Sequence, residues 1–293
     1  MRLDVYLAQN YPDFSRSTLQ KLVADGCVRV NDQTVATVSK DVNEDDNVSL
    51  DAPEIKTFDK ELMELTRSVI YEDDNVVVIN KPAGVLTHAK GVIANELTVA
   101  DFVRSRCTCD DADFLASNRA GIVHRLDRAT SGVLIAAKNP ATQSLLQRQF
   151  STRKAHKIYL AIAQKAPKLV SAKIDLPIGR NPKKPSSFRV DAKGKPAITN
   201  YETKRPFGSG AALLELRPLT GRTHQLRVHL AQLGSPIMGD ALYGPAEPGE
   251  RMFLHASSLE ITIPGLGENQ RKTFSAPLPN DFQTKLDELE RLS

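Results

Sequence analysis

The segment 120–139, AGIVHRLDRATSGVLIAAKN, holds a group of charged residues between two apolar runs. The charged residues, HRLDR at 124–128, are followed by a Thr-Ser-Gly turn before the chain becomes apolar again. Short apolar runs bounded by such a turn are typical of strands, so we expect strands over 121–126 and 132–138. A turn between them would expose Asp127 at the end of a sheet, where proteins often carry reactive groups.

Asp127 has two interpretations on this segment alone. The neighbouring Arg125 and Arg128 would favour the charged form of the carboxylate, and an ionised carboxylate can act as a nucleophile or a base. The same residues can also form a structural salt bridge at a turn. The segment by itself favours the salt bridge, and Arg128 is interpreted as a surface or phosphate-facing charge.

The whole chain has the composition of a soluble globular protein. Its 293 residues are 41% apolar and 25% charged, enough for one large domain or for a small and a larger one. The early acidic residue and the short apolar runs of MRLDVYLAQNYPDF do not fit a signal peptide, and no run is long enough to span a membrane, so a cytoplasmic protein is expected. The odd cysteine count (Cys27, Cys107, Cys109) fits free thiols, and no metal site is expected.

The net charge of +4 is unevenly distributed along the chain. Residues 1–68 contain 8 Lys and Arg against 13 Asp and Glu, whereas residues 69–293 contain 31 against 22. Within 151–230 there are 17 basic and 4 acidic residues. This concentration indicates a surface for a polyanion, most simply a nucleic acid, in preference to solvated lysines on loops.

The pattern of elements predicts two domains. Residues 1–55 show two amphipathic helical segments (2–11 and 15–26) and a hairpin turning at Asn31-Asp32, and we expect a polar linker at 56–68. Residues 69–293 are dominated by strands in meander order, with helices at 139–153 and 220–234, which favours an α+β fold. Besides those above, strands are expected at 75–82, 157–163, 197–205 and 212–219.

Two residues of the basic part are further candidates for a site. Tyr159 follows a cluster of basic residues at 153–157, and an aromatic ring beside cations can stack a base, although a lone strand tyrosine is more often core. Arg227 adjoins the Leu226/Leu230 stripe of helix 220–234, so its guanidinium needs a carboxylate or carbonyl partner. Because 151–230 holds only four acidic residues, the partner is expected elsewhere, and Asp127 is an obvious candidate. Together these residues indicate a basic cleft with one carboxylate, directed at nucleic acid.

The sequence also resembles a known family, the RluA-type RNA pseudouridine synthases, over essentially its whole length. HRLDRATSG at 124–132 is similar to the family's signature around its catalytic aspartate. Further motifs follow the family's order: INKPAGVLTH (79–88), HKIYLA (156–161), GKPAITNYE (194–202), GRTHQLRVHL (221–230), GSPIMGDALYG (234–244) and FLHASSLEI (253–261). Residues 2–31 resemble an S4 RNA-binding domain, a small αL-type fold that precedes many of these enzymes.

The resemblance implies a pseudouridine synthase fold, a mainly antiparallel mixed sheet with flanking helices and a central cleft. It implies conversion of uridine to pseudouridine in RNA without cofactor or metal, with Asp127 as the catalytic carboxylate, acting either at the sugar C1′ or on the pyrimidine ring. By the same resemblance Tyr159 stacks on the flipped base and assists proton removal, and Arg227 pairs with Asp127. Arg125 enters the space that the flipped nucleotide vacates, where a plug offsets lost stacking.

The remaining expected contacts with RNA fall into two groups. Leu226 and Leu254 are expected to form the apolar wall of the pocket, and Arg222 and His224 to contact the substrate. In the S4-like module, Arg2, Arg16, Lys21 and Arg29 are expected to bind RNA, although residues 1–50 hold only 5 basic residues against 8 acidic ones. The expected partner is ribosomal RNA of the large subunit or a pre-ribosomal particle, and the default oligomeric state is a monomer.

Two alternatives belong to other classes of protein. A non-catalytic RNA-binding or ribosome-assembly factor could retain the fold, but it has no need of a charge-paired carboxylate in its groove. A glycosidase with Asp127 as nucleophile would generally need a second carboxylate, and none lies near Asp127 in the sequence.

Overall fold

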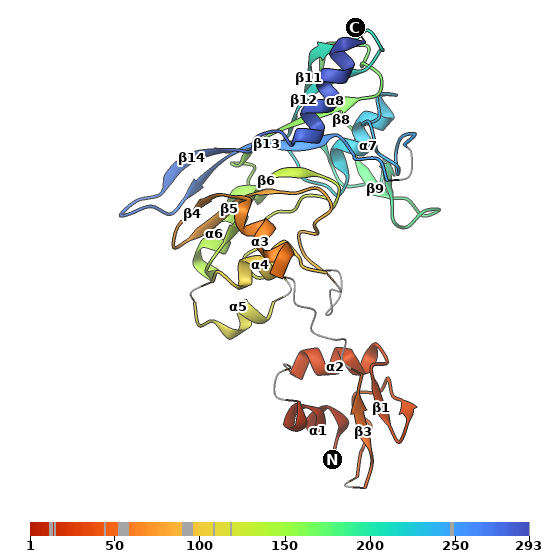
Figure 1. Ribbon diagram of the computed structural model, residues 1–293, viewed down its shortest axis with the longest axis vertical. Coiled ribbons are helices and arrows are strands. Elements are labelled where there is room, and N and C mark those ends of the chain that lie inside the picture. Colours follow the sequence, from red (N-terminus) through yellow and green to blue (C-terminus); the bar gives the residue numbers. More distant parts are fainter. Residues whose placement is uncertain are drawn as a thin grey trace. The chain divides into compact units, whose positions relative to one another are not determined.

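The computed structural model describes residues 1–11, 14, 16–43, 45–51, 59–89, 96–107, 109–117, 119–246 and 249–292. The chain divides into two compact units (Figure 1). The smaller unit comprises residues 1–59 and 89–96, and the larger comprises 60–88 and 97–293. Among the described residues, no helix is long and apolar enough to cross a membrane.

The smaller unit packs two helices, α1 (Leu3–Asn10) and α2 (Arg16–Ala24), with a three-stranded antiparallel sheet of order β2-β1-β3. Its core contains the apolar faces expected from the sequence, including Leu3, Leu7, Leu19, Leu22 and Val23. The expected hairpin is confirmed. The strands are β1 (Val28–Val30), β2 (Gln33–Thr34) and β3 (Val48–Leu50), and both turn residues between β1 and β2 have the positive φ that a tight hairpin turn needs.

The larger unit is built on one nine-stranded sheet of order β4-β5-β6-β13-β7-β12-β11-β8, with β14 paired to β13. All pairs are antiparallel except β6 with β13. A separate hairpin pairs β9 (Ile178–Arg180) with β10 (Phe188–Val190). The strands of the large sheet are β4 (Val69–Glu72), β5 (Val76–Lys81), β6 (Ser131–Ala137), β7 (His156–Ala163), β8 (Ser171–Asp175), β11 (Ile198–Pro206), β12 (Ala212–Pro218), β13 (Leu254–Ile263) and β14 (Gln270–Ser275).

β13 connects the two halves of this sheet. It pairs with β7 along most of its length, but it meets β6 only at two positions, where His255 lies opposite Ser131 and Ala256 opposite Gly132. Gly132 has φ +117°, and a Cβ atom there would lie 2.2 Å from the Ala256 carbonyl oxygen. Only glycine therefore permits this close approach, four residues after the end of the HRLDR segment.

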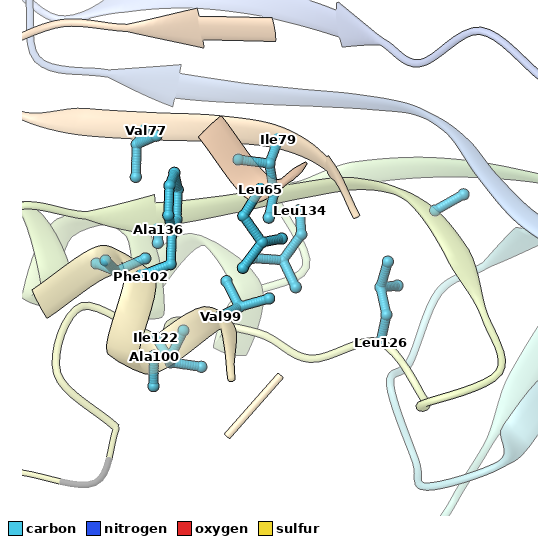
Figure 2. Packing of buried hydrophobic residues seen from close by; sticks show 12 residues of the cluster. Leu65, Val77, Ile79, Val99, Ala100, Phe102, Ile122, Leu126, Leu134 and Ala136 are labelled. Carbon is cyan, nitrogen blue, oxygen red and sulfur yellow. The ribbon is translucent and has the colours of Figure 1, made fainter. Parts of the chain in front are cut away.

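The first half of the sheet is covered by helices on both faces. One face packs Val77, Ile79 and Leu134 against α3 (Asp59–Arg67) and α4 (Val99–Arg104), as Figure 2 shows. On the other face, Leu146 of α6 (Pro140–Ser151) belongs to the cluster that contains Val76, Val78 and Ile135. All seven residues of β6 are consequently buried, which explains why the run at 133–137 is apolar throughout.

The second half of the sheet is covered in the same way. Leu226 and Leu230 of α7 (Gln225–Gln232) pack with Leu214 and Leu216, while Phe282, Leu286 and Leu289 of α8 (Asn280–Arg291) pack with Ile162. Figure 1 shows α8 alongside β11 and β12. The short helix α5 (Ala112–Ala116) completes the described helices.

Three features differ from the sequence-based expectations. The strand expected at 121–126 is wrong: this segment forms one isolated bridge, Ile122 with Ala136, because the His124 ring accepts the Ile135 amide hydrogen and Thr87 binds the Leu126 backbone. Helix α7 begins at Gln225 rather than near 220. The strands are not a simple meander, because β13 inserts between β6 and β7.

The segment expected to be a linker, 56–68, also contains regular structure. Its residues from 59 to 67 form α3, whose Leu65 is buried in the core of the larger unit. Residues 56–58 lie outside the described residues. The larger compact unit thus begins at Lys60.

The junction at Gly132 yields a stability prediction. Gly132→Ala should lower the free energy of unfolding by roughly 3 kcal/mol or more, because it adds overpacking to a strained φ. Gly210→Ala is the matched control, since Gly210 also has a positive φ of +87° but nothing lies within 4 Å of its added Cβ. The control should cost only about 1–2 kcal/mol. Chemical denaturation of both variants measures the difference, and equal losses would contradict the close-approach argument.

Candidate active site

Asp127 lies in the loop that leads into β6, beside the junction of the two half-sheets. The buried Lys81 holds this loop: its ammonium donates to the carbonyls of Pro82 (2.7 Å), Val85 (2.8 Å) and Arg128 (3.3 Å). Burial lowers the pKa of Lys81 to about 7, although the negative charge of Asp127 acts to raise it. Three carbonyl acceptors match the three N–H donors of a charged lysine, so the clamp is complete when Lys81 is protonated.

Arg128 takes part in the same clamp and not in the cleft beside Asp127. Its backbone carbonyl accepts from the Gly84 amide at 2.8 Å, and its Nε donates to the Gly84 carbonyl at 2.9 Å. The two arginines that flank Asp127 in the sequence therefore have different surroundings, since Arg125 lines the cleft.

Arg227 joins Asp127 to a second, fully buried carboxylate. Its Nε and Nη2 donate to the two oxygens of Asp240 at 2.8 and 2.7 Å, and its Nη1 lies 3.4 Å from Asp127 Oδ2. Burial alone would lower the pKa of Arg227, but the hydrogen bonds and charge of Asp240, aided by Asp127, raise it. The expected contact with Asp127 is present, but the main partner of Arg227 is Asp240, which bonds it through both oxygens.

Tyr159 lies where the two halves of the sheet meet. On β7 it pairs with Leu216 on one side and with Ala256 on the other, and its side chain packs against core clusters of both halves. Burial, together with the negative charge of Asp127, raises the pKa of Tyr159 above its usual range. The hydroxyl is therefore neutral at physiological pH, and the ring lines the cleft with Leu226 and Leu254.

His224 faces the other oxygen of the Asp127 carboxylate, from the same end of α7 as Arg227. Its Nε2 lies 3.9 Å from Asp127 Oδ1, and both side chains are 17% exposed. It occupies the N-cap position of α7 with a left-handed backbone, φ 57° and ψ 20°. Such a conformation costs a non-glycine residue on the order of 1–3 kcal/mol, and it is held here by the surrounding structure.

The cleft around Asp127 is strongly basic. Its described lining includes Arg125, Lys157, Arg222 and Arg227, with Asp127 as the only acidic residue. Burial lowers the pKa of Lys157 to about 8, so this lysine still carries a charge at neutral pH for most of the time. A second, adjoining cavity shares Arg125, Lys157, Tyr159 and Arg222 and adds His88, Arg119 and Arg153. This combination suits a polyanion that carries a base to be stacked.

The arginines expected to bind RNA in the smaller unit are partly paired. Arg2 and Arg16 both contact the buried Asp4, at 3.1 and 2.9 Å, while Arg29 pairs with Asp51 at 3.1 Å. The hydrogen bond of Arg16 is the main cause that lowers the pKa of Asp4 to about 2. Each arginine side chain remains at least half exposed and so free to meet phosphates. The Lys21 side chain lies outside the described part of the structure.

Sequence reasoning missed Asp240 and Tyr243 as parts of the site. Both lie in GSPIMGDALYG, which carries the family resemblance, but no periodicity relates them to Asp127 or Arg227. The shortage of acidic residues in 151–230 did indicate that the partner of Arg227 lies elsewhere. The next carboxylate after that range is Asp240, so extending the search by ten residues would have found it.

Comparison with known proteins assigns the class. The RNA pseudouridylate synthase family matches residues 75–232 and the S4 domain matches residues 1–48. The chain belongs to the RNA pseudouridine synthase family, with an S4 domain at its N-terminus. The first of these matches spans Asp127, Tyr159 and Arg227.

Relatives extend this assignment over nearly the full chain. The chain is 36% identical to ribosomal large subunit pseudouridine synthase D of Borreliella burgdorferi, covering 96% of this chain and 87% of that protein. It is 39% identical to an uncharacterized RNA pseudouridine synthase of Aquifex aeolicus, covering 83% and 77%. Among solved structures, human RNA pseudouridylate synthase domain containing 4 is 27% identical with a TM-score of 0.61, covering 80% of this chain and 97% of that one.

The partly buried His124 beside the cleft yields a pH prediction. Burial lowers the pKa of His124 to about 3, and its Nε2 accepts the Ile135 amide hydrogen. Between about pH 6.5 and 3, the unfolded chain therefore binds a proton at His124, whereas the folded protein does not. Stability should therefore fall as pH drops through this window, by up to about 1.4 kcal/mol per pH unit from this residue. Unfolding of His124→Gln, which retains an acceptor, should show a flatter dependence on pH.

His156→Gln is the comparison variant, since His156 on β7 is exposed and pairs with Glu260, itself partly exposed, at 3.1 Å. Because exposed ion pairs contribute little to stability, its dependence of unfolding free energy on pH should differ from wild type less than that of His124→Gln. Parallel curves for wild type and His124→Gln from pH 6.5 to 3 would refute the assignment of His124 as a partly buried neutral histidine.

Proposed function

We propose that this protein converts specific uridines of large-subunit ribosomal RNA to pseudouridine, as a monomer, with Asp127 as the catalytic carboxylate. The observation that carries the proposal is the placement of one carboxylate, oriented by Arg227, in a basic cleft next to an aromatic ring. A non-catalytic RNA-binding protein would have no need of that carboxylate. Several relatives, including the Borreliella burgdorferi protein, are named ribosomal large subunit pseudouridine synthase D.

The reaction needs only groups that the cleft contains. The N1–C1′ bond of uridine breaks, the uracil rotates, and a C5–C1′ bond forms, while C5 loses a proton and N1 ends protonated. Substrate and product are isomers, so no oxidant or co-substrate is consumed. Asp127 acts by attack at C1′ or at the pyrimidine ring, and its position beside the cleft is compatible with either.

The other residues of the cleft hold the extruded nucleotide, each through a different contact. Tyr159 stacks on the uracil, and its neutral hydroxyl favours this role over that of a resting phenolate base. Leu226 and Leu254 are 7% and 3% exposed and supply the apolar wall. Arg125, whose Nη1 lies 3.3 Å from His88 Nε2, is exposed at the mouth and fills the space that the base leaves.

Phosphate contacts come from the basic residues around this pocket. Arg222 lines both cavities, and its Nε donates to the Pro196 carbonyl at 3.1 Å, which leaves its other nitrogens for RNA. His224 contacts the substrate beside Asp127. In the S4 domain, Arg2, Arg16, Lys21 and Arg29 add contacts to the RNA backbone.

Pseudouridine mapping tests the proposal. Total RNA from cells that lack this enzyme is incubated with wild-type protein, Asp127→Ala or Asp127→Asn. Wild type should create pseudouridine at discrete positions of large-subunit ribosomal RNA, and both variants should lose at least about 100-fold in rate, because a nucleophile has no substitute in the site.

Asp175→Asn is the control variant, since Asp175 is an exposed carboxylate that pairs with Lys173 on β8. It should retain the wild-type rate. Absence of new pseudouridine with wild type would overturn the activity, modification of transfer RNA alone would overturn the ribosomal target, and an active Asp127→Ala would overturn the catalytic assignment.

A further inference from the structure

The side chain of His224 lies at the end of a continuous hydrogen-bonded chain that begins in the β9–β10 hairpin. The Phe188 backbone N–H donates to the Tyr243 hydroxyl oxygen at 2.8 Å, and that hydroxyl lies 2.8 Å from His224 Nδ1. His224 Nε2 in turn faces Asp127 Oδ1 at 3.9 Å. The two hydrogen bonds thus link a main-chain amide to His224, whose Nε2 faces the proposed catalytic carboxylate.

The direction of the bonds follows from the donors available. A phenol has one hydrogen to donate, and the Tyr243 oxygen already accepts from Phe188. Burial raises the pKa of Tyr243, which keeps that hydrogen in place at neutral pH. Among the described residues, the other hydrogen-bond partner of this hydroxyl is His224 Nδ1, and the phenol hydrogen is satisfied there when Nδ1 accepts it. A neutral imidazole whose Nδ1 accepts carries its hydrogen on Nε2, the nitrogen that faces Asp127.

The charge on Asp127 favours the same tautomer. The opposite arrangement would set the Nε2 lone pair against a carboxylate oxygen, which is repulsive. Burial lowers the pKa of His224, with Arg227 and Arg125 acting in the same direction and Asp127 and Asp240 opposing them. The imidazole is therefore neutral when the site is at rest.

The ring also has little freedom to turn away. His224 lies between Phe188 and Tyr243, in edge-to-face contact with both, at centroid distances of 5.5 and 5.6 Å. Tyr243 is fixed by packing with Ile178 and Val228 and by the Arg227 guanidinium over its ring at 5.1 Å. His224 has a left-handed backbone, which is unfavourable for a residue other than glycine, and this conformation directs the imidazole toward Asp127.

We propose that Tyr243 and His224 form a positioning relay that fixes the Nε2–H tautomer of His224 and supplies Asp127 with a second N–H, directed at Oδ1 while Arg227 faces Oδ2. The inference rests on the proposed function and deepens it. The separation of 3.9 Å exceeds a hydrogen bond, and the contact closes when substrate fills the pocket, as catalytic hydrogen bonds often do. Tyr243 acts through His224 and is a positioning residue.

Two substitutions of His224 separate the nitrogens. The amide of glutamine reaches the position of Nε2, whereas that of asparagine reaches only the position of Nδ1. His224→Gln should therefore keep a donor for Asp127 and retain a single-turnover rate within about threefold of wild type. His224→Asn should lose about 10- to 100-fold, the effect of a lost hydrogen bond to a charged group, with little change in RNA affinity.

Tyr243→Phe tests the other end of the relay, because it removes the hydroxyl and keeps the ring over Arg227. It should slow single turnover about 3- to 10-fold, the effect of one neutral hydrogen bond. In ¹⁵N spectra the His224 signals, assigned by their absence in His224→Asn, should report an Nε2–H tautomer in wild type and a mixture in Tyr243→Phe. Tyr201→Phe is the control, since its hydroxyl donates to the Leu169 carbonyl and Tyr201 is not among the described lining residues of the cleft; it should leave the rate unchanged.

The outcomes are distinct. Equal rates for His224→Gln, His224→Asn and wild type, or an Nδ1–H tautomer in wild type, would overturn the relay while leaving the proposed function intact. A wild-type protein without pseudouridine activity would overturn the proposed function, and the tautomer measurement would still decide whether the relay exists. If Tyr201→Phe slowed turnover as much as Tyr243→Phe, the effect of Tyr243→Phe would reflect a general loss of stability, and the relay would be overturned.

Discussion

The site depends on one cation shared between two carboxylates. Asp240 is buried and takes two nitrogens of Arg227, which leaves one nitrogen directed at Asp127. A buried arginine without Asp240 would be an uncompensated charge, so this pair is required for the fold around the cleft. Because Asp240 holds the guanidinium in place, Asp127 gains an oriented neighbour without having to anchor it, and its carboxylate remains available to the cleft.

The architecture of the sheet gives Asp127 its position. The parallel contact between β6 and β13 covers only two residue pairs, and Asp127 lies in the loop just before it. Gly132 permits the contact, while Lys81 ties the loop to residues 82–85 by donating to the carbonyls of Arg128, Pro82 and Val85. Tyr159 reaches the same place from β7, the strand that β13 pairs with on its other side. The catalytic candidates therefore meet at the seam between two separately covered half-sheets.

Much of this arrangement could be predicted from the sequence because it is local. Helix α6, the hairpin at Asn31-Asp32 and the strands β5, β6, β7, β11 and β12 follow from periodicity and turn residues. The pairing of β13 between β6 and β7 could not be predicted, since it joins β13 to residues that lie 93 to 124 positions earlier in the chain. The strand expected at 121–126 failed because the His124 ring accepts the amide hydrogen of Ile135 on the facing strand, and Thr87 bonds the backbone N–H and carbonyl of Leu126.

The site shows the same division between local and distant information. Composition indicated a basic surface, and the resemblance singled out Asp127, Tyr159 and Arg227. The true anchor of Arg227, and the path from Phe188 through Tyr243 to His224, depend on loops that only the folded chain brings together. Charge counting pointed toward a partner outside 151–230 but could not distinguish a reacting carboxylate from an anchoring one.

The fork of Arg227, and not its charge alone, orients Asp127. Arg227→Lys retains the charge but cannot bond Asp240 through two nitrogens and still reach Asp127. Single-turnover kinetics on a large-subunit ribosomal RNA fragment should be measured together with the dissociation constant. We expect nearly unchanged binding and a rate lower by roughly 100-fold, as for other positioned donors. Turnover at the wild-type rate would show that the charge alone suffices.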